Sequence, residues 1–271
     1  MQVFDVISGD SPIVLGQPHG GTWVPDVIVA RFNAVGAGLS DTDWHITQLY
    51  DGLLSGVSVV KSNVHRYVID ANRDPAGTSL YPGQNTTTLV PLTDFDGRTI
   101  WSEGQEPSVD EMEQRRVAYH APYHDALRAE LERVIAVHGV AILFDCHSIR
   151  SNIPFLFEGE LPIFNTGTNQ GSTCAGAVET AVNTVAHASG LGSVLNGRFK
   201  GGWTTRHYGQ PETGIHAIQM EISQRAYMHE TPPWIFDEDR AARVRPHLRQ
   251  MLENLSELAL SGALLSEGRD L

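Results

Sequence analysis

Three short apolar segments, far apart in the sequence, each lead to a side chain that can bind a metal ion or move a proton. The first leads to His19, the second to His147, and the third contains Glu221. If these segments are strands of an α/β sheet, their carboxyl ends lie at the edge where such sheets build their sites. Two imidazoles that hold an ion and one carboxylate that moves protons are the groups of a mononuclear zinc hydrolase.

The residues next to the two histidines support a role as metal ligands. His19 precedes Gly20 and Gly21, which let the backbone turn sharply and approach a bound group closely. Asp145 and His147 are two residues apart, so in an extended chain their side chains point to the same side. One of them can then bind the metal while the other orients its neighbour. The alternative for His19 is a histidine that only caps or packs within a turn.

A catalytic zinc needs a third protein ligand, and Asp43 is the residue that we predict. It lies near the start of a helix that we expect over residues 41–54. An acid in the first turn of a helix also complements the helix dipole without any metal. Asp41 is expected to be the helix N-cap, which leaves Asp43 available. Asp41 and His45 are the alternatives for the third ligand.

Glu221 is the predicted catalytic carboxylate. It alternates with Met220 and Ile222 in an apolar strand, so its side chain is expected to be buried. Because an unpaired buried charge is costly, such a carboxylate must be paired, bound to a metal or catalytic. We predict that Glu221 is the general base that takes a proton from the attacking water. The alternative is a structural salt bridge to Arg225.

Several arginines fall in loops beside these groups, and an arginine binds a carboxylate with a planar pair of donors. Asn72 and Arg73, which are adjacent in the sequence, are suited to hold a carboxylate together. A single surface arginine is more often only solvated, so this prediction depends on clustering in the folded chain. The residues predicted to bind the substrate are Asn72, Arg73, Arg206, Arg66 and Arg150.

The composition predicts a soluble protein of the cytoplasm. The 271 residues carry a formal charge of −13, which argues against nucleic acid and anionic membranes as partners. A small anionic substrate remains compatible, because arginines can reverse the field within one pocket. The two cysteines, Cys146 and Cys174, make no disulfide framework. We recognise neither a secretory signal nor a run of about 18 apolar residues that could span a membrane. The oligomeric state is left open.

Segments that suit strands alternate with segments of helical periodicity along the whole chain. This alternation favours an α/β class, a three-layer α/β/α fold with a central, largely parallel mixed sheet. No linker or internal repeat is recognised, so a single domain over residues 1–271 is expected. The expected strands cover residues 13–15, 57–60, 64–69, 140–144 and 215–222, and the expected helices cover residues 41–54, 108–138, 172–185 and 236–260.

Details of individual segments sharpen this prediction. Ser108 is expected to cap the second helix, which should bend near Pro122 and end at Gly139. Residues 75–107 form a long loop, which is usually functional or mobile, and whether it closes over the site stays open. Irregular structure is also expected over residues 150–172 and 199–214.

Longer motifs carry a resemblance to a known family. They are Pro18-His19-Gly20-Gly21, Asp70-Ala71-Asn72-Arg73-Asp74-Pro75, Asp145-Cys146-His147-Ser148, Phe199-Lys200-Gly201-Gly202-Trp203-Thr204-Thr205-Arg206-His207-Tyr208-Gly209, Gln219-Met220-Glu221-Ile222 and Ala226-Tyr227-Met228. With these motifs in this order, the chain resembles the N-formylglutamate amidohydrolase family from about residue 12 to residue 255. The stretch over residues 199–209 is the most specific part.

The resemblance implies a zinc-dependent hydrolase on a phosphorylase/hydrolase-like α/β/α fold, related to zinc carboxypeptidases and aspartoacylase-type enzymes. It implies cleavage of N-formyl-L-glutamate to formate and L-glutamate, the last step of one route of histidine degradation. One departure matters, because the carboxypeptidase relatives have a His-x-x-Glu pair of ligands and here Thr22 lies three residues after His19. Asp43 is therefore inferred from its position and is not transferred from the family.

The predicted mechanism places one metal ion between His19, Asp43 and His147, with a water molecule in its open position. Zinc is expected, and cobalt or manganese could share such a site. Glu221 takes a proton from the water and passes it to the leaving amine. The alternatives are a zinc amidase or peptidase for other N-acyl amino acids or peptides, and a non-catalytic module that binds acidic amino acids. The sequence leaves the native metal and the acyl group open.

Overall fold

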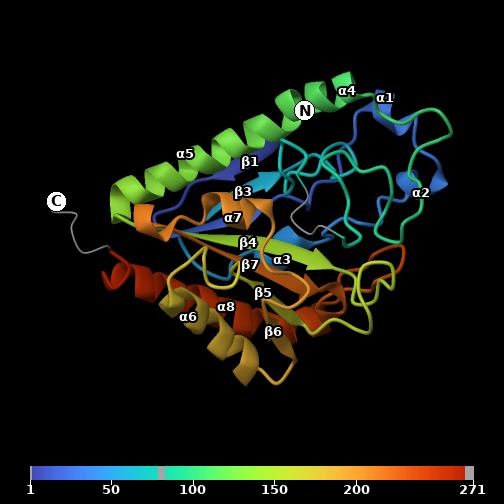
Figure 1. Cartoon of the computed structure of the whole chain (residues 1–271). Coiled ribbons are helices and arrows are strands. Elements are labelled where there is room, and N and C mark those ends of the chain that lie inside the picture. The colour runs from blue at the N-terminus through green and yellow to red at the C-terminus, as the bar shows by residue number, and fades with distance from the viewer. Residues whose placement is uncertain (1, 79–82, 266–271) are drawn as a thin grey trace.

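A computed structural model describes residues 2–78 and 83–265 of the chain, and its strands form one mixed sheet (Figure 1). The strands of the described residues are β1 (Phe4–Ile7), β2 (Ile13–Gln17), β3 (Ser58–Ser62), β4 (Ala141–Ile149), β5 (Phe164–Gly167), β6 (Ser193–Leu195) and β7 (Ile215–Ser223). Their order in the sheet is β1-β3-β2-β4-β7-β5-β6. The neighbours β3, β2, β4 and β7 are parallel, whereas β1 and β5 join this block antiparallel. The largely parallel mixed sheet that the sequence predicts is confirmed.

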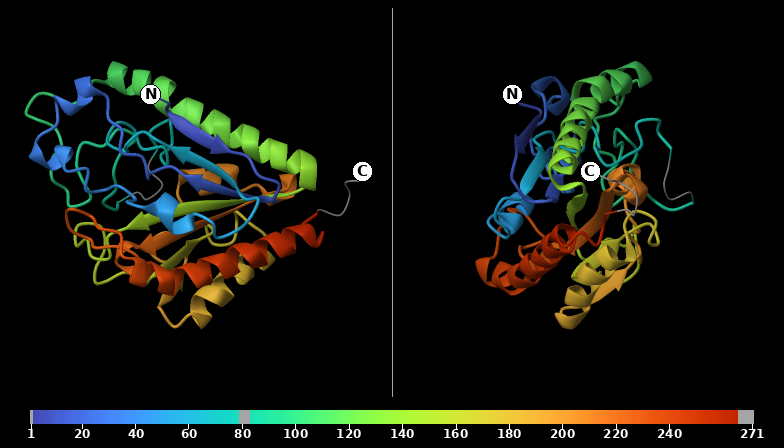
Figure 2. Two further views of the ribbon diagram at one scale, coloured as in Figure 1. Left: turned by 180° about the vertical axis from the view of Figure 1, so that it is seen from behind. Right: turned by 90° about the vertical axis from the view of Figure 1, so that its left-hand side faces the viewer.

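Helices cover both faces of this sheet, as the two views in Figure 2 show. One face packs against α5 and α7, and the other packs against α3, α6 and α8. The α-helices of the described residues are α1 (Asp26–Val29), α2 (Ala34–Ala37), α3 (Ile46–Tyr50), α4 (Val109–Arg115), α5 (Ala121–His138), α6 (Gly176–Ala188), α7 (Trp203–Tyr208) and α8 (Glu238–Leu260). A π-helical turn, η1 (Arg116–His120), joins α4 to α5, and two short 3-10 turns are η2 (Pro211–Thr213) and η3 (Gln224–Ala226).

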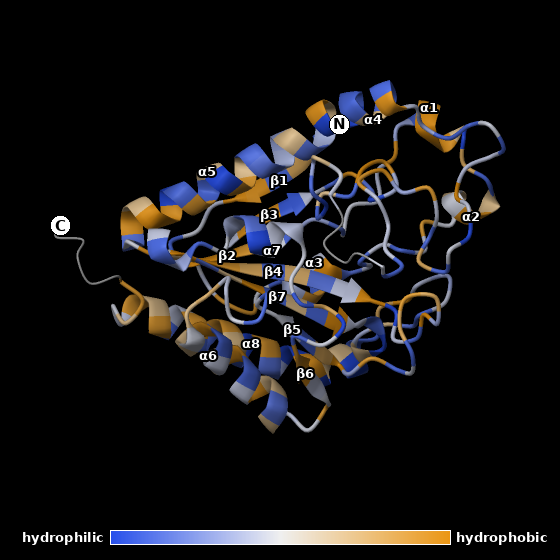
Figure 3. Cartoon of the chain, in the orientation of Figure 1, coloured by the Kyte–Doolittle hydropathy of each residue, from blue (hydrophilic) through white to orange (hydrophobic). Residues whose placement is uncertain are grey.

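The patterning of the sequence explains this layered arrangement. All nine residues of β4 are buried, because this strand lies between β2 and β7 and is covered on both faces. Along α5, Leu127, Leu131 and Val134 recur at helical spacing and face the sheet. Figure 3 shows hydrophobic and hydrophilic residues following one another along this helix. None of the helices in the described residues combines the length and apolar character that a membrane span requires.

Several predicted elements are confirmed with small shifts. Ser108 caps α4, since its hydroxyl accepts from the Glu111 amide at 3.2 Å. The helix predicted over residues 108–138 is interrupted before Pro122 by the π-helical turn η1, which directly precedes α5. Gly139 ends α5 in the left-handed conformation with φ 73°. The terminal helix predicted over residues 236–260 is α8.

Other predictions were wrong where tertiary contacts override local preference. The helix expected over residues 41–54 is reduced to α3, because His45 has φ 60°, a left-handed conformation that no helix contains. Asp41 is therefore not a helix N-cap. The strand expected over residues 64–69 is a turn, in which only Val64 forms an isolated bridge, to Trp23.

Short elements also went unpredicted. Strands β1 and β6 have no counterpart among the predictions, β5 lies within residues 150–172, and α7 lies within residues 199–214. The helix expected to start after Ser172 begins at Gly176 with Ala175 as its N-cap. In the long loop, residues 79–82 lie outside the described residues, and the described part is irregular apart from isolated bridges such as Thr93 to Thr99. The single-domain organisation stays a prediction.

Gly139 offers a test of how α5 ends. We expect Gly139→Ala to lower the free energy of unfolding by about 1 kcal/mol, because an alanine is strained at positive φ. Gly176→Ala is the matched control, since Gly176 starts α6 and an added Cβ there would meet no atom within 4 Å. The control should be neutral or slightly stabilising. Urea unfolding of both variants measures this, and equal effects would contradict the proposed end of the helix.

Candidate metal centre and active site

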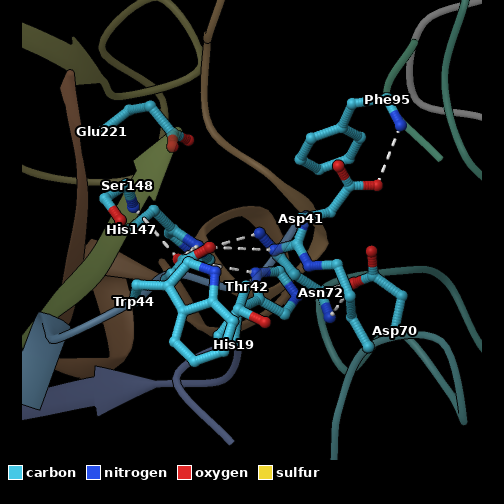
Figure 4. Close-up of polar contacts among 12 residues, drawn as sticks. His19, Asp41, Thr42, Trp44, Asp70, Asn72, Phe95, His147, Ser148 and Glu221 are labelled. Carbon is cyan, nitrogen blue, oxygen red and sulfur yellow. Dashed lines mark hydrogen bonds and ion pairs between the residues drawn. The ribbon is translucent and has the colours of Figure 1, made fainter. Parts of the chain in front are cut away.

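His19 and His147 lie together near the carboxyl ends of the parallel strands β2 and β4 (Figure 4). Asp43 lies beside both histidines. The ring centroids of the two histidines are 5.0 Å apart. Both Nδ1 atoms face the same carboxylate oxygen, Asp43 Oδ2, at 3.9 Å from His19 and 3.6 Å from His147. All three side chains are buried, and their nearest potential ligand atoms lie within 4.8 Å of one another. The structure thus brings together the three residues that the sequence predicts as metal ligands.

Neighbouring strands and one loop position these groups. His19 follows β2, and His147 lies in β4, which pairs with β2 in parallel. A Cβ at Gly21 would lie 2.3 Å from the Asn63 backbone, so only glycine lets the chain turn here after His19. The loop that carries Asp43 is tied to β2 by the Asp43 amide, which donates to the His19 carbonyl at 3.1 Å.

The Asp43 carboxylate is itself held on both oxygens. The Ser148 backbone amide donates to Oδ2 at 3.0 Å, and Arg66 Nη2 donates to Oδ1 at 3.3 Å. Burial by itself would raise the pKa of Asp43, but the Arg66 guanidinium and the two histidines lower it below its ordinary value. Asp43 is therefore an anion in this site.

Two further carboxylates lie behind the histidine rings. His19 Nε2 is 2.7 Å from Asp70 Oδ1, and His147 Nε2 is 2.9 Å from Asp145 Oδ1. Asp70 favours a proton on His19 Nε2, which directs the His19 Nδ1 lone pair toward Asp43. His147 Nε2 lies between the Asp145 carboxylate and the Asn72 amide, and these two groups hold its ring. Asp145 is oriented in turn by Thr205, whose hydroxyl donates to Oδ2 at 2.7 Å. Asp145 therefore lies where the spacing with His147 predicts an orienting carboxylate.

The donor set fits a small divalent cation. Ligand atoms about 2.1 Å from a tetrahedral ion lie about 3.4 Å from one another, close to the two distances from Asp43 Oδ2. Within the described residues, His19 Nδ1 is buried without a hydrogen-bond partner, which is costly unless a ligand occupies it. The chemistry of two imidazoles and a carboxylate suits zinc and similar transition metals.

The pKa shifts of the two histidines also fit a site for a cation. Burial lowers the pKa of His19 to about 4, so this imidazole is neutral near pH 7. Burial also opposes a charge on His147, but the Asp145 and Asp43 carboxylates raise the pKa of His147 well above its ordinary value. The group as a whole therefore favours one positive charge among its members, which a proton or a bound metal ion can supply.

The two rival ligands lie elsewhere. His45 Nε2 is 2.6 Å from the Trp234 carbonyl. Asp41 accepts from the Tyr67 hydroxyl and from the Phe95 amide, both at 2.8 Å. Of the three candidates for the third ligand, the structure brings only Asp43 to the histidines.

Glu221, in β7, lies in the same pocket as His19 and His147. Its side chain is buried, and one carboxylate oxygen accepts from Gln219 Nε2 at 3.1 Å. Burial raises the pKa of Glu221 to about 8. The alternative salt bridge to Arg225 is not formed, because Arg225 pairs with Glu160 at 3.3 Å. This leaves Glu221 as an acid–base group facing the pocket.

The pocket also carries positive charge beside the proposed metal ligands His19, Asp43 and His147. Arg66 and Arg73 line it, as does Asn72, whose Nδ2 lies 3.2 Å from His147 Nε2. Arg198 lines it as well, although it was not predicted. Its position directly before the Phe199 motif is the signal that could have identified it. The remaining lining residues are Asn85, Thr86, Thr87, Phe95, Ser148, Ile149, Leu156, Phe199, Gly202, Gln219, His19 and His147.

Arg150 and Arg206 were also predicted to bind substrate, but the structure does not place them among the residues that line this pocket. Arg150 directly follows β4, and its Nη2 donates to Asp96 at 3.1 Å. Arg206 lies on α7, where its Nε donates to the Gly201 carbonyl at 2.8 Å. Both guanidiniums thus make hydrogen bonds to partners outside the predicted substrate site.

Comparisons with known proteins identify relatives of the chain. Two N-formylglutamate deformylases, from Pseudomonas aeruginosa and Pseudomonas putida, are each 43% identical to the chain over 256 residues, 94% of this chain and 96% of theirs. An N-formylglutamate amidohydrolase structure from Ralstonia eutropha JMP134 has the same fold, with TM-score 0.79 and 23% identity over 97% of this chain and 100% of that one. A protein from Agrobacterium tumefaciens shares the fold with TM-score 0.72 and 16% identity, over 97% of this chain and 96% of that one.

The fold, the buried acid–base group and these matches define the class of protein, which is an amide hydrolase of the α/β class. A sequence model of the family described as N-formylglutamate amidohydrolase matches residues 11–228. The chain belongs to the N-formylglutamate amidohydrolase family.

Asp41 makes the stability of the metal-free protein depend on pH. Burial raises the pKa of Asp41 to about 7, so the protonated form is favoured in the folded state. The resulting stabilisation is complete below the unfolded pKa of about 4 and is lost as the pH rises to 7. Relative to wild type, we expect Asp41→Asn, which does not titrate, to gain up to about 4 kcal/mol over this range and to stay level above it.

Urea unfolding at several pH values, with a chelator present, measures this difference. Asp125→Asn is the control, because Asp125 is exposed on α5, where it pairs with the exposed Arg128. A constant difference between Asp41→Asn and wild type from pH 4 to 8 would contradict the raised pKa.

Proposed function

We propose that this chain hydrolyses N-formyl-L-glutamate to formate and L-glutamate, with a zinc ion held by His19, Asp43 and His147. Cobalt and manganese are alternatives for the ion. The observation that carries the proposal is the convergence of two Nδ1 atoms and Asp43 Oδ2 on one buried point, in the same pocket as Glu221. The formyl group and the glutamate come from the names of the two Pseudomonas relatives.

The bound ion would supply Lewis-acid chemistry, since it polarises a carbonyl oxygen and lowers the pKa of a water molecule. His19 and His147 are suited to hold it, because Asp70 and Asp145 orient both rings from behind. Asp43 contributes a negative charge, which the site keeps by means of Arg66 and the Ser148 amide.

Glu221 is proposed to move the proton during hydrolysis. It accepts a proton from the attacking water and passes it to the amine nitrogen of the departing glutamate. A raised pKa suits this role, because a group that both takes and returns a proton works best near the operating pH. Beside a divalent cation the carboxylate form of Glu221 is favoured, as opposite charge lowers the pKa of an acid. Gln219 holds the carboxylate in place at 3.1 Å.

The cations of the pocket are proposed to bind the two carboxylates of the substrate. Arg66, Arg73 and Arg198 line the pocket of a chain whose formal charge is −13, which places positive groups where an anion would bind. Arg66 also pairs with Asp43 at 3.3 Å and Arg73 with Asp70 at 3.6 Å. Asn72 adds amide donors between Arg73 and His147. A small dianionic N-acyl amino acid fits this arrangement. The cytoplasmic location stays a prediction.

Metal removal tests the proposal directly. We expect the purified protein to release formate from N-formyl-L-glutamate, to lose this activity after dialysis against a chelator, and to regain it with one equivalent of zinc. Formate release and metal analysis measure the two quantities. Full activity in the chelated protein would contradict the metal assignment, and a preference for long-chain N-acyl glutamates would contradict the formyl assignment.

Glu221→Gln tests the proton-transfer role. The amide keeps the size of the side chain but cannot accept the proton, so we expect kcat to fall roughly 100- to 10,000-fold, with zinc content unchanged. Glu130→Gln is the matched control, since Glu130 is a buried acid on α5 that pairs with Arg133. Near wild-type turnover in Glu221→Gln would show that another group moves the proton.

A further inference from the structure

The loop that carries Asp43 is held by two side chains from the segment that follows β7. Gln224 Nε2 donates to the Thr42 carbonyl at 2.9 Å, and the Tyr227 hydroxyl lies 2.9 Å from the Trp44 carbonyl. These two carbonyls belong to the residues on either side of Asp43. The backbone is therefore held directly before and directly after the candidate ligand.

Ser148 joins the two holding side chains to each other. Its Oγ lies 2.7 Å from the Tyr227 hydroxyl and 3.4 Å from Gln224 Nε2. Tyr227 has one hydroxyl proton and a carbonyl only accepts, so that proton goes to Trp44 and the serine proton completes the contact with Tyr227. The Ser148 backbone amide in turn donates to Asp43 Oδ2 at 3.0 Å. The network thus holds both the backbone and the carboxylate of Asp43.

Asp43 needs such support more than the two histidines do. His147 lies within a strand of nine buried residues and His19 lies two residues after the end of β2, whereas Asp43 lies in a turn before α3. The next residue but one, His45, has φ 60°. A ligand in a loop is placed less accurately than a ligand on a strand unless hydrogen bonds hold the loop.

We propose that Gln224, Ser148 and Tyr227 form a clamp that positions Asp43 for metal binding. The clamp residues are positioning residues, since they act through Asp43 and its loop. The inference rests on the proposed role of Asp43 as a metal ligand. Gln224 lies three residues after Glu221 in the chain, so the segment that carries the proposed base also locates the third ligand.

Tyr227→Phe and Gln224→Met test the clamp. Each variant keeps the approximate size of the side chain and removes the donor to one carbonyl. Tyr50→Phe is the matched control, because Tyr50 is buried in the same core cluster and its hydroxyl lacks a hydrogen-bond partner among the described residues. The measurement is the Kd for Zn²⁺, obtained by chelator competition on the full-length protein after its metal has been removed.

We expect the Kd for Zn²⁺ to rise 10- to 100-fold in Tyr227→Phe and Gln224→Met, as for other residues that orient a metal ligand. Tyr50→Phe should bind as wild type does. The zinc concentration that restores half of the hydrolytic activity should rise by the same factor. A purely structural role would lower the stability of the metal-free protein without moving the zinc midpoint.

A second comparison separates the clamp from the metal assignment. In an Asp43→Ala background, where the positioned ligand is absent, Tyr227→Phe should cause no further loss of zinc affinity. Equal zinc affinity in wild type and both clamp variants would overturn the clamp while leaving the proposed function in place. A wild-type protein that binds no zinc at all would overturn both, and only that result would remove the metal site itself.

Discussion

The site is built around three electron-rich atoms that repel one another and that the fold nevertheless holds close together: His19 Nδ1, His147 Nδ1 and Asp43 Oδ2. The two Nδ1 atoms both face one buried carboxylate oxygen, and such a group is costly to bury without a positive charge among its members. In the metal-free chain the carboxylates of Asp145 and then Asp43 raise the pKa of His147 despite its burial, so a proton on His147 supplies the charge. A divalent ion held by His19, Asp43 and His147, as proposed, would supply a larger positive charge. Asp70, Asp145 and Arg66 then serve to orient this group and to keep Asp43 ionised.

The central part of the sheet is the means by which these atoms meet. Strands β2, β4 and β7 are consecutive parallel neighbours, so their carboxyl ends lie at one edge. His147 and Glu221 are register partners on β4 and β7, so one of the proposed metal ligands and the proposed base lie side by side. Because these strands are buried, the site is built on the covered centre of the sheet. The less regular segments contribute the third proposed ligand and arginines of the pocket.

The charge distribution explains how an acidic protein can be suited to an anionic substrate. Most of the excess negative charge lies outside the pocket, whereas Arg66, Arg73 and Arg198 line it. Arg73 and Arg198 also donate to backbone carbonyls at Thr87 and Asn85, residues of the long loop that line the same pocket. The loop is thus attached to the site by the groups proposed to bind substrate. Residues 85–87, which belong to no helix or strand, are thus held by arginine side chains that donate to their carbonyls.

The sequence by itself determined the strand-end residues His19, His147 and Glu221, because strand periodicity and glycine turns are properties of neighbouring residues. It also determined the α/β class and the family resemblance. Only the tertiary structure decided that Asp43 and not Asp41 or His45 reaches the histidines, since the left-handed backbone of His45 and hydrogen bonds from residues more than 100 positions away set that turn. It likewise brought Arg198 to the pocket and directed Arg150 and Arg206 to other partners. Such choices depend on long-range contacts between irregular segments, which leave no periodic pattern in the chain.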